Sequence, residues 1–324
     1  MITKNKISDI ILSGAVGDAY GYKVEFEQWP CIVNQYGEYG IQLSDIKEWI
    51  VSDDTQMTLF TLYAILTSTN NYILPEELKD INQLLFDSYR QWLRTQTLRQ
   101  PEEKDPSFLQ FKELYQRRAP GITCLEALSS GMQGNLFQPL NDSKGSGCLM
   151  RTAPLSFLDI NIKNLFKLGM MQASLTHGDK DALLSTGFFN SLLKCGLYGD
   201  TLENGIKKSM SLLMGYDSHH HLFNLINKAI YTEELAPEEL YHYLGAGWVA
   251  DEALAIAIYS VIHSDSYEKA LHMSVNHSGD SDTTGSLTGQ LYAAYYDVPS
   301  WIYSLNFDVK ESITWLLNKV NYVG

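Results

Sequence analysis

The chain has 324 residues, of which 45% are hydrophobic and 19% are charged, and its formal net charge is −14. A chain of this length and composition can bury a substantial core, as one large globular domain or as two ordinary ones. The negative charge argues against a nucleic-acid-binding surface, which needs a basic footprint. No apolar run approaches the roughly 20 residues of a membrane-spanning helix. We therefore expect neither nucleic acid nor membrane among its partners.

Cysteine spacing and the N-terminus indicate the cellular compartment. The four cysteines, Cys31, Cys124, Cys148 and Cys195, are widely separated and form no C-x-x-C pair, which argues against a zinc site or a disulfide framework. A short apolar segment runs directly into the glycine-containing residues 14–18 without a cleavage-site pattern, so it does not resemble a signal peptide. We predict a cytoplasmic protein with reduced thiols.

Helical periodicity dominates the chain. Apolar residues within 7–16 recur at helical spacing and predict a helix that ends in a glycine-punctuated turn. The segment 100–120 is polar, contains three prolines, and is predicted to be a loop or a lid. Because no sustained β-alternation and no boundary is visible, we predict an all-α fold with one domain over residues 1–324. Further helices are predicted over residues 55–66, 75–100, 122–133, 165–175, 182–195, 251–259 and 289–296.

An acidic cluster opens the helix that is predicted over residues 55–66. It consists of Ser52, Asp53 and Asp54. One of these residues can cap the helix, and acids suit its positive end. Capping needs only one acid, whereas three oxygen donors in the first turn can also face a metal ion. The two interpretations are compatible.

A second acidic cluster lies in residues 276–285, which we predict to be a loop. Asp280 and Asp282 are alternate residues between two glycines, and Thr283 follows them. In an extended or turn-like backbone the two carboxylates can converge on one hard cation, with the threonine as a neutral donor. The alternative is a polar loop in which an aspartate or a threonine caps the next helix.

Taken together, the two clusters provide oxygen donors for two hexacoordinate cations if Asp282 bridges them and water completes the shells. Four carboxylates packed together without a cation would repel one another or shift their pKa values. A binuclear Mg²⁺ site resolves this conflict and can orient a substrate and activate a water. The predicted metal ligands are Ser52, Asp53, Asp54, Asp280, Asp282 and Thr283.

Three other polar features have open interpretations. Glu25 stands between two apolar residues and is either a surface-strand residue or a group aimed into a pocket. Residues 143–147 alternate glycine and hydroxyl side chains ahead of a helix predicted at 148–151, and they form either a phosphate cradle or a plain loop. His177 lies between two predicted helices, where a histidine is commonly a cap or a satisfied interior residue.

Six sequence blocks, in this order, resemble the ADP-ribosylglycohydrolase family, of the dinitrogenase-reductase-activating glycohydrolase and ADP-ribosylarginine hydrolase type. The resemblance covers roughly residues 8–305. The blocks are residues 14–21 (GAVGDAYG) with Glu25, residues 52–57 (SDDTQM), residues 143–147 (SKGSG) with Met150, Arg151, Ala153 and Pro154, the pair Thr176 and His177, residues 245–248 (GAGW) with 252–255 (EALA), and residues 279–285 (GDSDTTG).

The resemblance implies an all-α fold with two Mg²⁺ ions at the base of an ADP-ribose cleft, with Mn²⁺ as the other candidate metal. Ser52, Asp53, Asp54 and Asp282 would hold one ion, and Asp280, Asp282 and Thr283 the other. Glu25 would position the scissile bond or a water. ADP-ribose would be contacted by Ser143, Lys144, Gly145, Ser146, Gly147 and His177. The chain departs from the family pattern at Ser52, where many members have threonine, and at Ser146, where asparagine or cysteine is common.

The activity implied is Mg²⁺-dependent hydrolysis that removes ADP-ribose from protein side chains, with arginine as the favoured acceptor, and the catalytic residues would be Glu25, Asp53, Asp54, Asp280 and Asp282. The partners would be an ADP-ribosylated protein and a cognate ADP-ribosyltransferase, whether regulatory or a toxin. One alternative is an immunity protein that neutralises a transferase toxin by contact. Another is a hydrolase of serine-linked, threonine-linked or small-molecule ADP-ribosyl bonds.

Overall fold

The regular structure of the chain is helical throughout the part that the computed structural model describes, which is residues 2–67, 78–102 and 107–320. Those residues contain isolated β-bridges but no strand, which confirms the predicted all-α fold. One continuous hydrophobic core joins their helices. The α-helices are α1 (Lys4–Gly21), α2 (Trp29–Tyr36), α3 (Asp53–Thr67), α4 (Leu78–Thr97), α5 (Ile122–Ser129), α6 (Ile162–Ser174), α7 (Lys180–Leu197), α8 (Leu202–Leu213), α9 (His220–Tyr231), α10 (Pro237–Leu244), α11 (Ala250–Ile262), α12 (Tyr267–Val275), α13 (Ser281–Tyr295) and α14 (Lys310–Lys319).

Several of these helices begin at a short polar residue that accepts hydrogen bonds from free backbone N–H groups. The Asp179 carboxylate accepts from the N–H groups of Asp181 and Ala182 at 2.8 and 3.4 Å, at the start of α7. The N–H of Asp179 itself donates to the carbonyl of Ser143 at 3.2 Å. The first turn of α7 therefore also fixes the beginning of the glycine-rich loop at residues 143–147.

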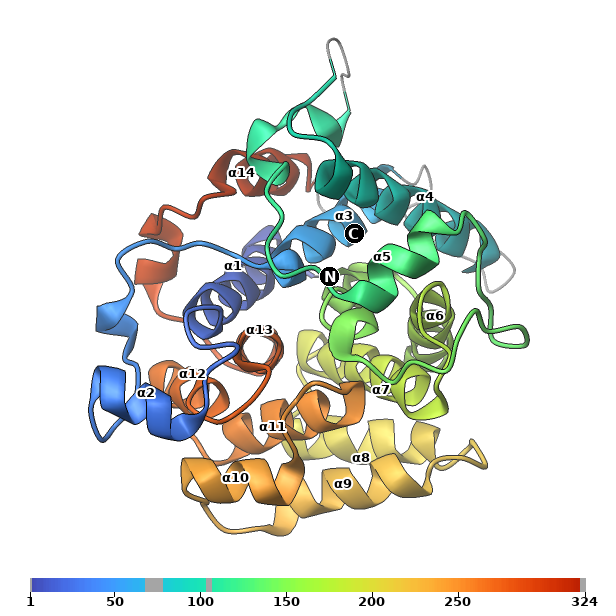
Figure 1. The fold of residues 1–324 in the computed structure, drawn as a ribbon. Helices are drawn as coiled ribbons and strands as arrows, with labels where there is room; N and C mark the ends of the chain where they lie inside the picture. The colour runs from blue at the N-terminus through green and yellow to red at the C-terminus, as the bar shows by residue number, and fades with distance from the viewer. Residues whose placement is uncertain (1, 68–77, 103–106, 321–324) are drawn as a thin grey trace.

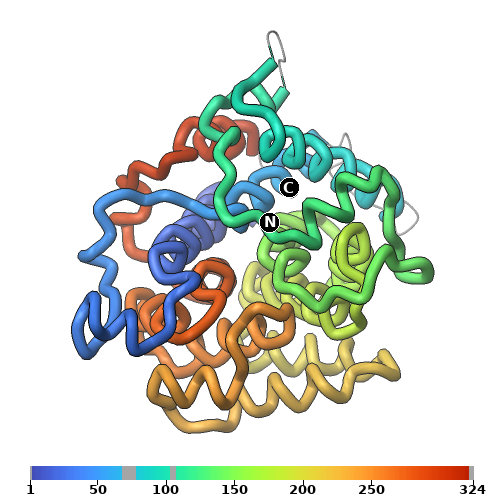
Figure 2. Tube along the Cα trace, viewed as in Figure 1, coloured from blue at the N-terminus to red at the C-terminus, as the bar shows by residue number. Residues whose placement is uncertain are grey.

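Helices α1 and α13, which come from opposite ends of the sequence, pack side by side at the centre of the fold (Figures 1 and 2). Glycines permit this approach. A Cβ on Gly17 would lie 2.0 Å from the carbonyl oxygen of Gly285, and a Cβ on Gly21 would lie 2.0 Å from that of Ser281. No side chain fits into such spaces. The missing side chains therefore bring the end of α1 against the start of α13.

Helix α13 is enclosed by further helices. It contacts α3, α7, α11 and α12 as well as α1. Helix α11 is built largely from small and apolar residues, and Ala253, Ala255 and Ala257 are fully buried, which suits close packing on all sides. Helices α8, α9 and α10 form an outer layer beside α7 and α11 (Figure 1). This packing fixes where the first turn of α13 lies.

Several predicted boundaries are wrong. The first helix does not end before Gly17, because α1 continues to Gly21. The helix predicted over 122–133 ends at Ser129, and the one predicted over 289–296 begins at Ser281. Residues 276–285 do not form one loop, because α13 begins at Ser281 and places Asp282 and Thr283 in its first turn. Residues 148–151 do not start an α-helix. A 3₁₀ turn ends at Cys148, and a second 3₁₀ segment with Pro154 near its start follows at residues 153–157, where the proline lacks an N–H for a regular helical bond.

The segment 100–120 is irregular, as predicted, but its described part is anchored rather than lid-like. Two 3₁₀ turns place Phe108 and Leu114 in the core, fully buried. The ring of Phe108 stacks on those of Tyr63 and Trp315 at centroid distances of 5.2 and 5.8 Å. Residues 103–106 of this segment, and residues 75–77 of the helix predicted over 75–100, lie outside the described residues.

Candidate metal centre and cleft

Two acidic segments that are far apart in the sequence meet in one cleft. Asp53 and Asp54 begin α3, Asp280 immediately precedes α13, and Asp282 lies in the first turn of α13. All four side chains are buried, and all four line the same cavity. Both segments are helix N-termini, whose free N–H groups and dipoles favour negative charge. Helix packing thus creates the oxygen-rich cluster that the sequence predicts.

Glu25 adds a further carboxylate to this wall of the cavity, and Thr283 adds a neutral hydroxyl. Glu25 is buried in the turn that follows α1, so its side chain belongs to a pocket and not to a surface strand. One oxygen each from Glu25, Asp280 and Asp282 lie within 4.8 Å of one another. Oε2 of Glu25 and Oδ2 of Asp54 are buried without a hydrogen-bond partner. Such atoms require a ligand or a water.

The carboxylates destabilise one another as anions. Burial, and then repulsion from a neighbouring carboxylate, raises the pKa values of Asp53, Asp54 and Asp282 well above their ordinary range. Burial together with the charges of Asp282 and Asp280 raises the pKa of Glu25 to about 10. A divalent cation among these oxygens would remove the conflict, and Mg²⁺ or Mn²⁺ suits carboxylate and hydroxyl donors. The donor set therefore fits a hard cation.

Asp18 holds the start of α3, and with it Asp53 and Asp54, in place. Its fully buried carboxylate accepts hydrogen bonds from the N–H groups of Ser52 at 2.8 Å and Thr55 at 2.9 Å, so the end of α1 fixes the start of α3. Burial and the charge of Asp282 raise the pKa of Asp18 to about 7. Ser52 does not line the cavity. Its hydroxyl accepts from the N–H of Asp54 at 3.2 Å and is within hydrogen-bonding reach of Asp282.

A second part of the cavity wall is formed by Gly145, Ser146, Gly147 and His177. A Cβ on Gly145 would lie 3.3 Å from Nε2 of His177, so the loop backbone passes close to the imidazole. The Ser146 hydroxyl donates to Oδ2 of Asp280 at 2.8 Å and links the glycine loop to the acidic cluster. The structure thus brings these four predicted binding residues to the same cleft as the carboxylates.

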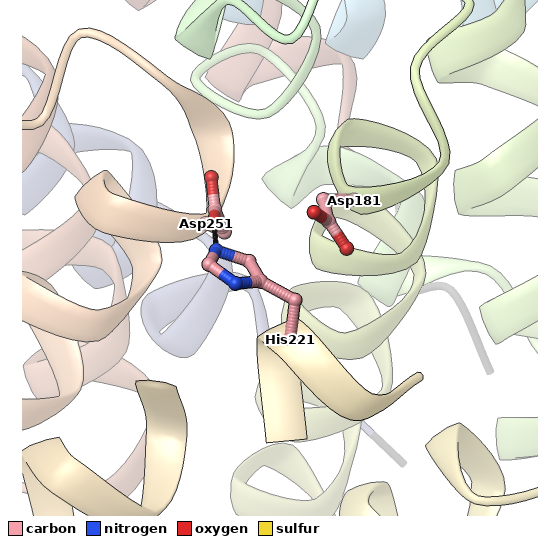
Figure 3. Close-up of side chains that lie close together, drawn as sticks. All are labelled: Asp181, His221 and Asp251. Carbon is pink, nitrogen blue, oxygen red and sulfur yellow. Dashed lines mark hydrogen bonds and ion pairs between the residues drawn. The ribbon is translucent and has the colours of Figure 1, made fainter. Parts of the chain in front are cut away.

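Lys144 and Ser143, by contrast, do not line the cavity. The Lys144 amine lies 2.8 Å from Oδ2 of Asp251 and 3.3 Å from Oδ2 of Asp181. Figure 3 shows His221 beside the same two carboxylates, and its Nε2 lies 2.8 Å from Oδ2 of Asp251. These three side chains resemble a metal-ligand set, but the Lys144 ammonium already supplies the positive charge there. The geometry indicates a structural charge network.

Some residues that form the site have no individual role that the sequence predicts. Thr123 and Cys124 line the cavity from α5, an ordinary short helix whose sequence carries no signal for this. Trp248 also lines it and stacks on Phe26 at the rim, with 5.8 Å between ring centroids. Trp248 follows Gly247, whose φ of 83° favours glycine. The glycines of the motif at residues 245–248 are the sequence feature that marks the position of Trp248.

The fold and the site define an all-α protein with a cleft whose buried carboxylates could hold a divalent cation. The chain belongs to the ADP-ribosylglycohydrolase family, because the model of that family, described as ADP-ribosylglycohydrolase, matches residues 1–321. The family resemblance seen in the sequence is thereby confirmed.

Individual relatives are distant but cover nearly the whole chain. The ADP-ribosyl-[dinitrogen reductase] glycohydrolase of Rhodospirillum rubrum is 23% identical over 318 residues, which span 92% of this chain and 90% of the relative. The ADP-ribosylhydrolase ARH1 of Dictyostelium discoideum is 25% identical over 369 aligned positions, which span 91% of this chain and 88% of the relative.

A solved structure described as an ADP-ribosylglycohydrolase-related protein complex has the same fold. Its TM-score to this chain is 0.69 at 23% sequence identity, and the match covers 98% of this chain and 97% of that one. Among the described residues, no helix combines the length and the apolar character that a membrane span requires.

Proposed function

We propose that the protein is a divalent-metal-dependent hydrolase, with Mg²⁺ or Mn²⁺ as its metal, that releases ADP-ribose from modified arginine side chains of a protein, in the cytoplasm. The observation that carries the proposal is the convergence of Glu25, Asp280 and Asp282 oxygens within 4.8 Å in one buried cleft. Membership of the ADP-ribosylglycohydrolase family supplies the reaction class. The name of the Rhodospirillum rubrum relative, which acts on ADP-ribosyl-dinitrogen reductase, supports a modified protein as substrate.

We propose positions for two cations in this cleft, which is lined by five of the six predicted ligands, whereas Ser52 lies outside its lining, next to Asp54. Ser52, Asp53, Asp54 and Asp282 would hold one, and Asp280, Asp282 and Thr283 would hold the other. When bound, such cations supply Lewis-acid chemistry, which orients ribose hydroxyls and activates a water.

The residues of the chain provide the remaining functions. Glu25 is the acid–base candidate, because it lines the cleft and its buried Oε2 has no hydrogen-bond partner. In the reaction, a bond forms between the water oxygen and the anomeric carbon while the bond from that carbon to the acceptor nitrogen breaks. The electron pair leaves with the nitrogen. Glu25 takes a proton from the water or delivers one to the departing group.

The test is release of free ADP-ribose from an arginine-ADP-ribosylated protein with Mg²⁺, with Mn²⁺ and with chelator. We expect metal-dependent release that falls at least about 100-fold in Asp280→Ala, because one of the proposed metal ligands is lost. The matched control is Asp217→Ala, which removes an exposed aspartate outside the cleft and should leave the rate unchanged. A near-wild-type rate in Asp280→Ala would exclude the two-metal proposal.

The same assay separates the alternatives. Release only from serine- or threonine-linked substrates would keep the hydrolase and replace the acceptor. No release from any substrate, together with binding of a transferase that survives in Asp280→Ala, would favour a contact-based immunity protein, because such binding does not need the metal ligands.

A further inference from the structure

A wholly buried arginine lies behind the cleft. Arg151 is 0% exposed, and among the described residues its hydrogen bonds go to sulfur and hydroxyl groups rather than to a carboxylate. Its guanidinium lies 4.2 Å from the centre of the Tyr89 ring. One terminal nitrogen donates to Sγ of Cys124 at 3.4 Å, and the other donates to Oγ1 of Thr176 at 2.8 Å. Burying a charge without a counter-ion is costly, so this position calls for a specific explanation.

Thr176 connects the arginine to the cavity wall. Its Oγ1 lies 2.8 Å from Nδ1 of His177, which lines the cavity. A hydroxyl has one proton to donate. Arg151 already donates an N–H to Oγ1 of Thr176. A second N–H, from Nδ1 of the imidazole, would place another partial positive charge beside the guanidinium. The favoured arrangement has the Thr176 hydroxyl donating to Nδ1, which leaves the imidazole proton on Nε2.

The other edge of the imidazole faces the glycine loop. A Cβ on Gly145 would lie 3.3 Å from Nε2 of His177, and a Cβ on Gly147 would lie 3.7 Å from it. No hydrogen-bond partner for Nε2 is found among the described residues. Burial, together with the charge of Arg151, lowers the pKa of His177 to about 3, so the ring is neutral at working pH.

We propose that Arg151 and Thr176 are positioning residues that hold His177 as a neutral imidazole whose Nε2–H donates to a phosphate oxygen of ADP-ribose beside Gly145 and Gly147. This inference rests on the proposed function for the identity of the ligand. Arg151 contributes a fixed positive charge behind the site, and the histidine contributes a directed donor. Neither role needs a protonated histidine.

The tautomer can be measured without any ligand or activity. In the full-length protein labelled with ¹⁵N-histidine, long-range ¹H–¹⁵N spectra distinguish a protonated Nε2 from a protonated Nδ1, and the signals of His177 are assigned by their loss in His177→Gln. We expect the Nε2–H form in the wild type. In Thr176→Val, which removes the hydroxyl and keeps the shape, we expect the fixed tautomer to give way to a mixture.

Binding of free ADP-ribose, measured by calorimetry, supplies the second readout. Loss of one directed donor should raise the dissociation constant about tenfold in Thr176→Val, and Thr176→Ser should restore both the affinity and the tautomer. The matched control is Thr288→Val. Thr288 is also fully buried, but its hydroxyl has no hydrogen-bond partner, so neither readout should change.

The outcomes separate this inference from the proposed function. An Nδ1–H tautomer in the wild type would overturn the relay, whatever the ligand. So would unchanged ADP-ribose affinity in a folded Thr176→Val. Failure of the wild type to bind ADP-ribose would overturn both the proposed function and the phosphate role of His177. If Thr176→Val does not fold, the wild-type tautomer and the affinity of Thr176→Ser still decide the question.

Discussion

The contacts of the Lys144 side chain differ from those that its place in the sequence predicts. It stands in a glycine- and serine-rich loop, where a lysine is expected to meet phosphate, yet its amine lies between Asp251 and Asp181. Asp251 is fully buried, so the ammonium offsets a charge that would otherwise be costly. The Lys144 carbonyl also accepts the N–H of Ala250 at 2.9 Å. Side chain and backbone together attach the loop to α7 and α11.

Replacing Lys144 with methionine should therefore reduce stability more than ligand binding. We expect the free energy of unfolding, measured by urea denaturation, to fall by about 2 kcal/mol. This is less than for a wholly buried pair, because the Lys144 side chain is 29% exposed. ADP-ribose affinity of the folded variant should stay within about twofold of the wild type, a difference below 0.5 kcal/mol.

The control is Lys207→Met, which removes an exposed lysine paired with Glu203 on the surface of α8 and should leave stability unchanged. A Lys144→Met protein that keeps its stability but loses ADP-ribose affinity would show that the lysine binds phosphate after all.

The close contact between helices α1 and α13 places the first turn of α13, and therefore Asp282, in the acidic cleft. A Cβ on Gly17 would lie 2.0 Å from the Gly285 carbonyl oxygen, and backbone cannot yield as a flexible side chain can. Gly17→Ala should therefore separate the helices and displace the first turn of α13. We expect the free energy of unfolding to fall by about 3 kcal/mol or more. Mg²⁺ binding, measured by calorimetry, should weaken as well, because Asp282 moves with that turn.

Gly215→Ala is the control for that substitution. Its added Cβ would lie 3.1 Å from the Leu212 carbonyl oxygen, a close contact, but Gly215 is exposed in a turn that can shift slightly. This variant should keep both stability and Mg²⁺ affinity close to those of the wild type. Wild-type cation binding by Gly17→Ala would mean that the close approach of the helices does not position the carboxylates.

Local sequence pattern accounts for most of the helices but for only part of the site. Apolar periodicity and polar caps are short-range signals, so helices such as α3 and α7 could be predicted near their true bounds. The two acidic clusters could be connected because four carboxylates need a common cation. The support given by Asp18 to the N–H groups of Ser52 and Thr55 depends on how α1 packs against α3, and neither sequence pattern nor residue spacing encodes that contact.

For the whole molecule, the buried acids link folding to both protons and cations. Acids whose pKa values are raised in the folded state bind protons more tightly there than in the unfolded chain. Such groups stabilise the fold below their ordinary pKa values of 3.8 to 4.5, and this stabilisation is lost as the pH rises through the folded values. Those folded values are about 7 for Asp18 and about 10 for Glu25. A bound cation can take the place of the protons.

We therefore expect the metal-free protein to become less stable as the pH rises from 5 to 8. The slope is about 1.4 kcal/mol per pH unit for each extra proton held by the folded state. Urea denaturation with chelator, in about 0.5 M salt to screen the surface charge, measures this slope. Excess Mg²⁺ should flatten it, and Asp282→Asn should reduce it without metal, because Asp282 raises the pKa values of several neighbours. Asp217→Asn, a substitution of an exposed acid, should leave it unchanged. A metal-free protein whose stability does not change over this range would show that these carboxylates do not hold protons in the fold, and the electrostatic case for a cation centre would fail with it.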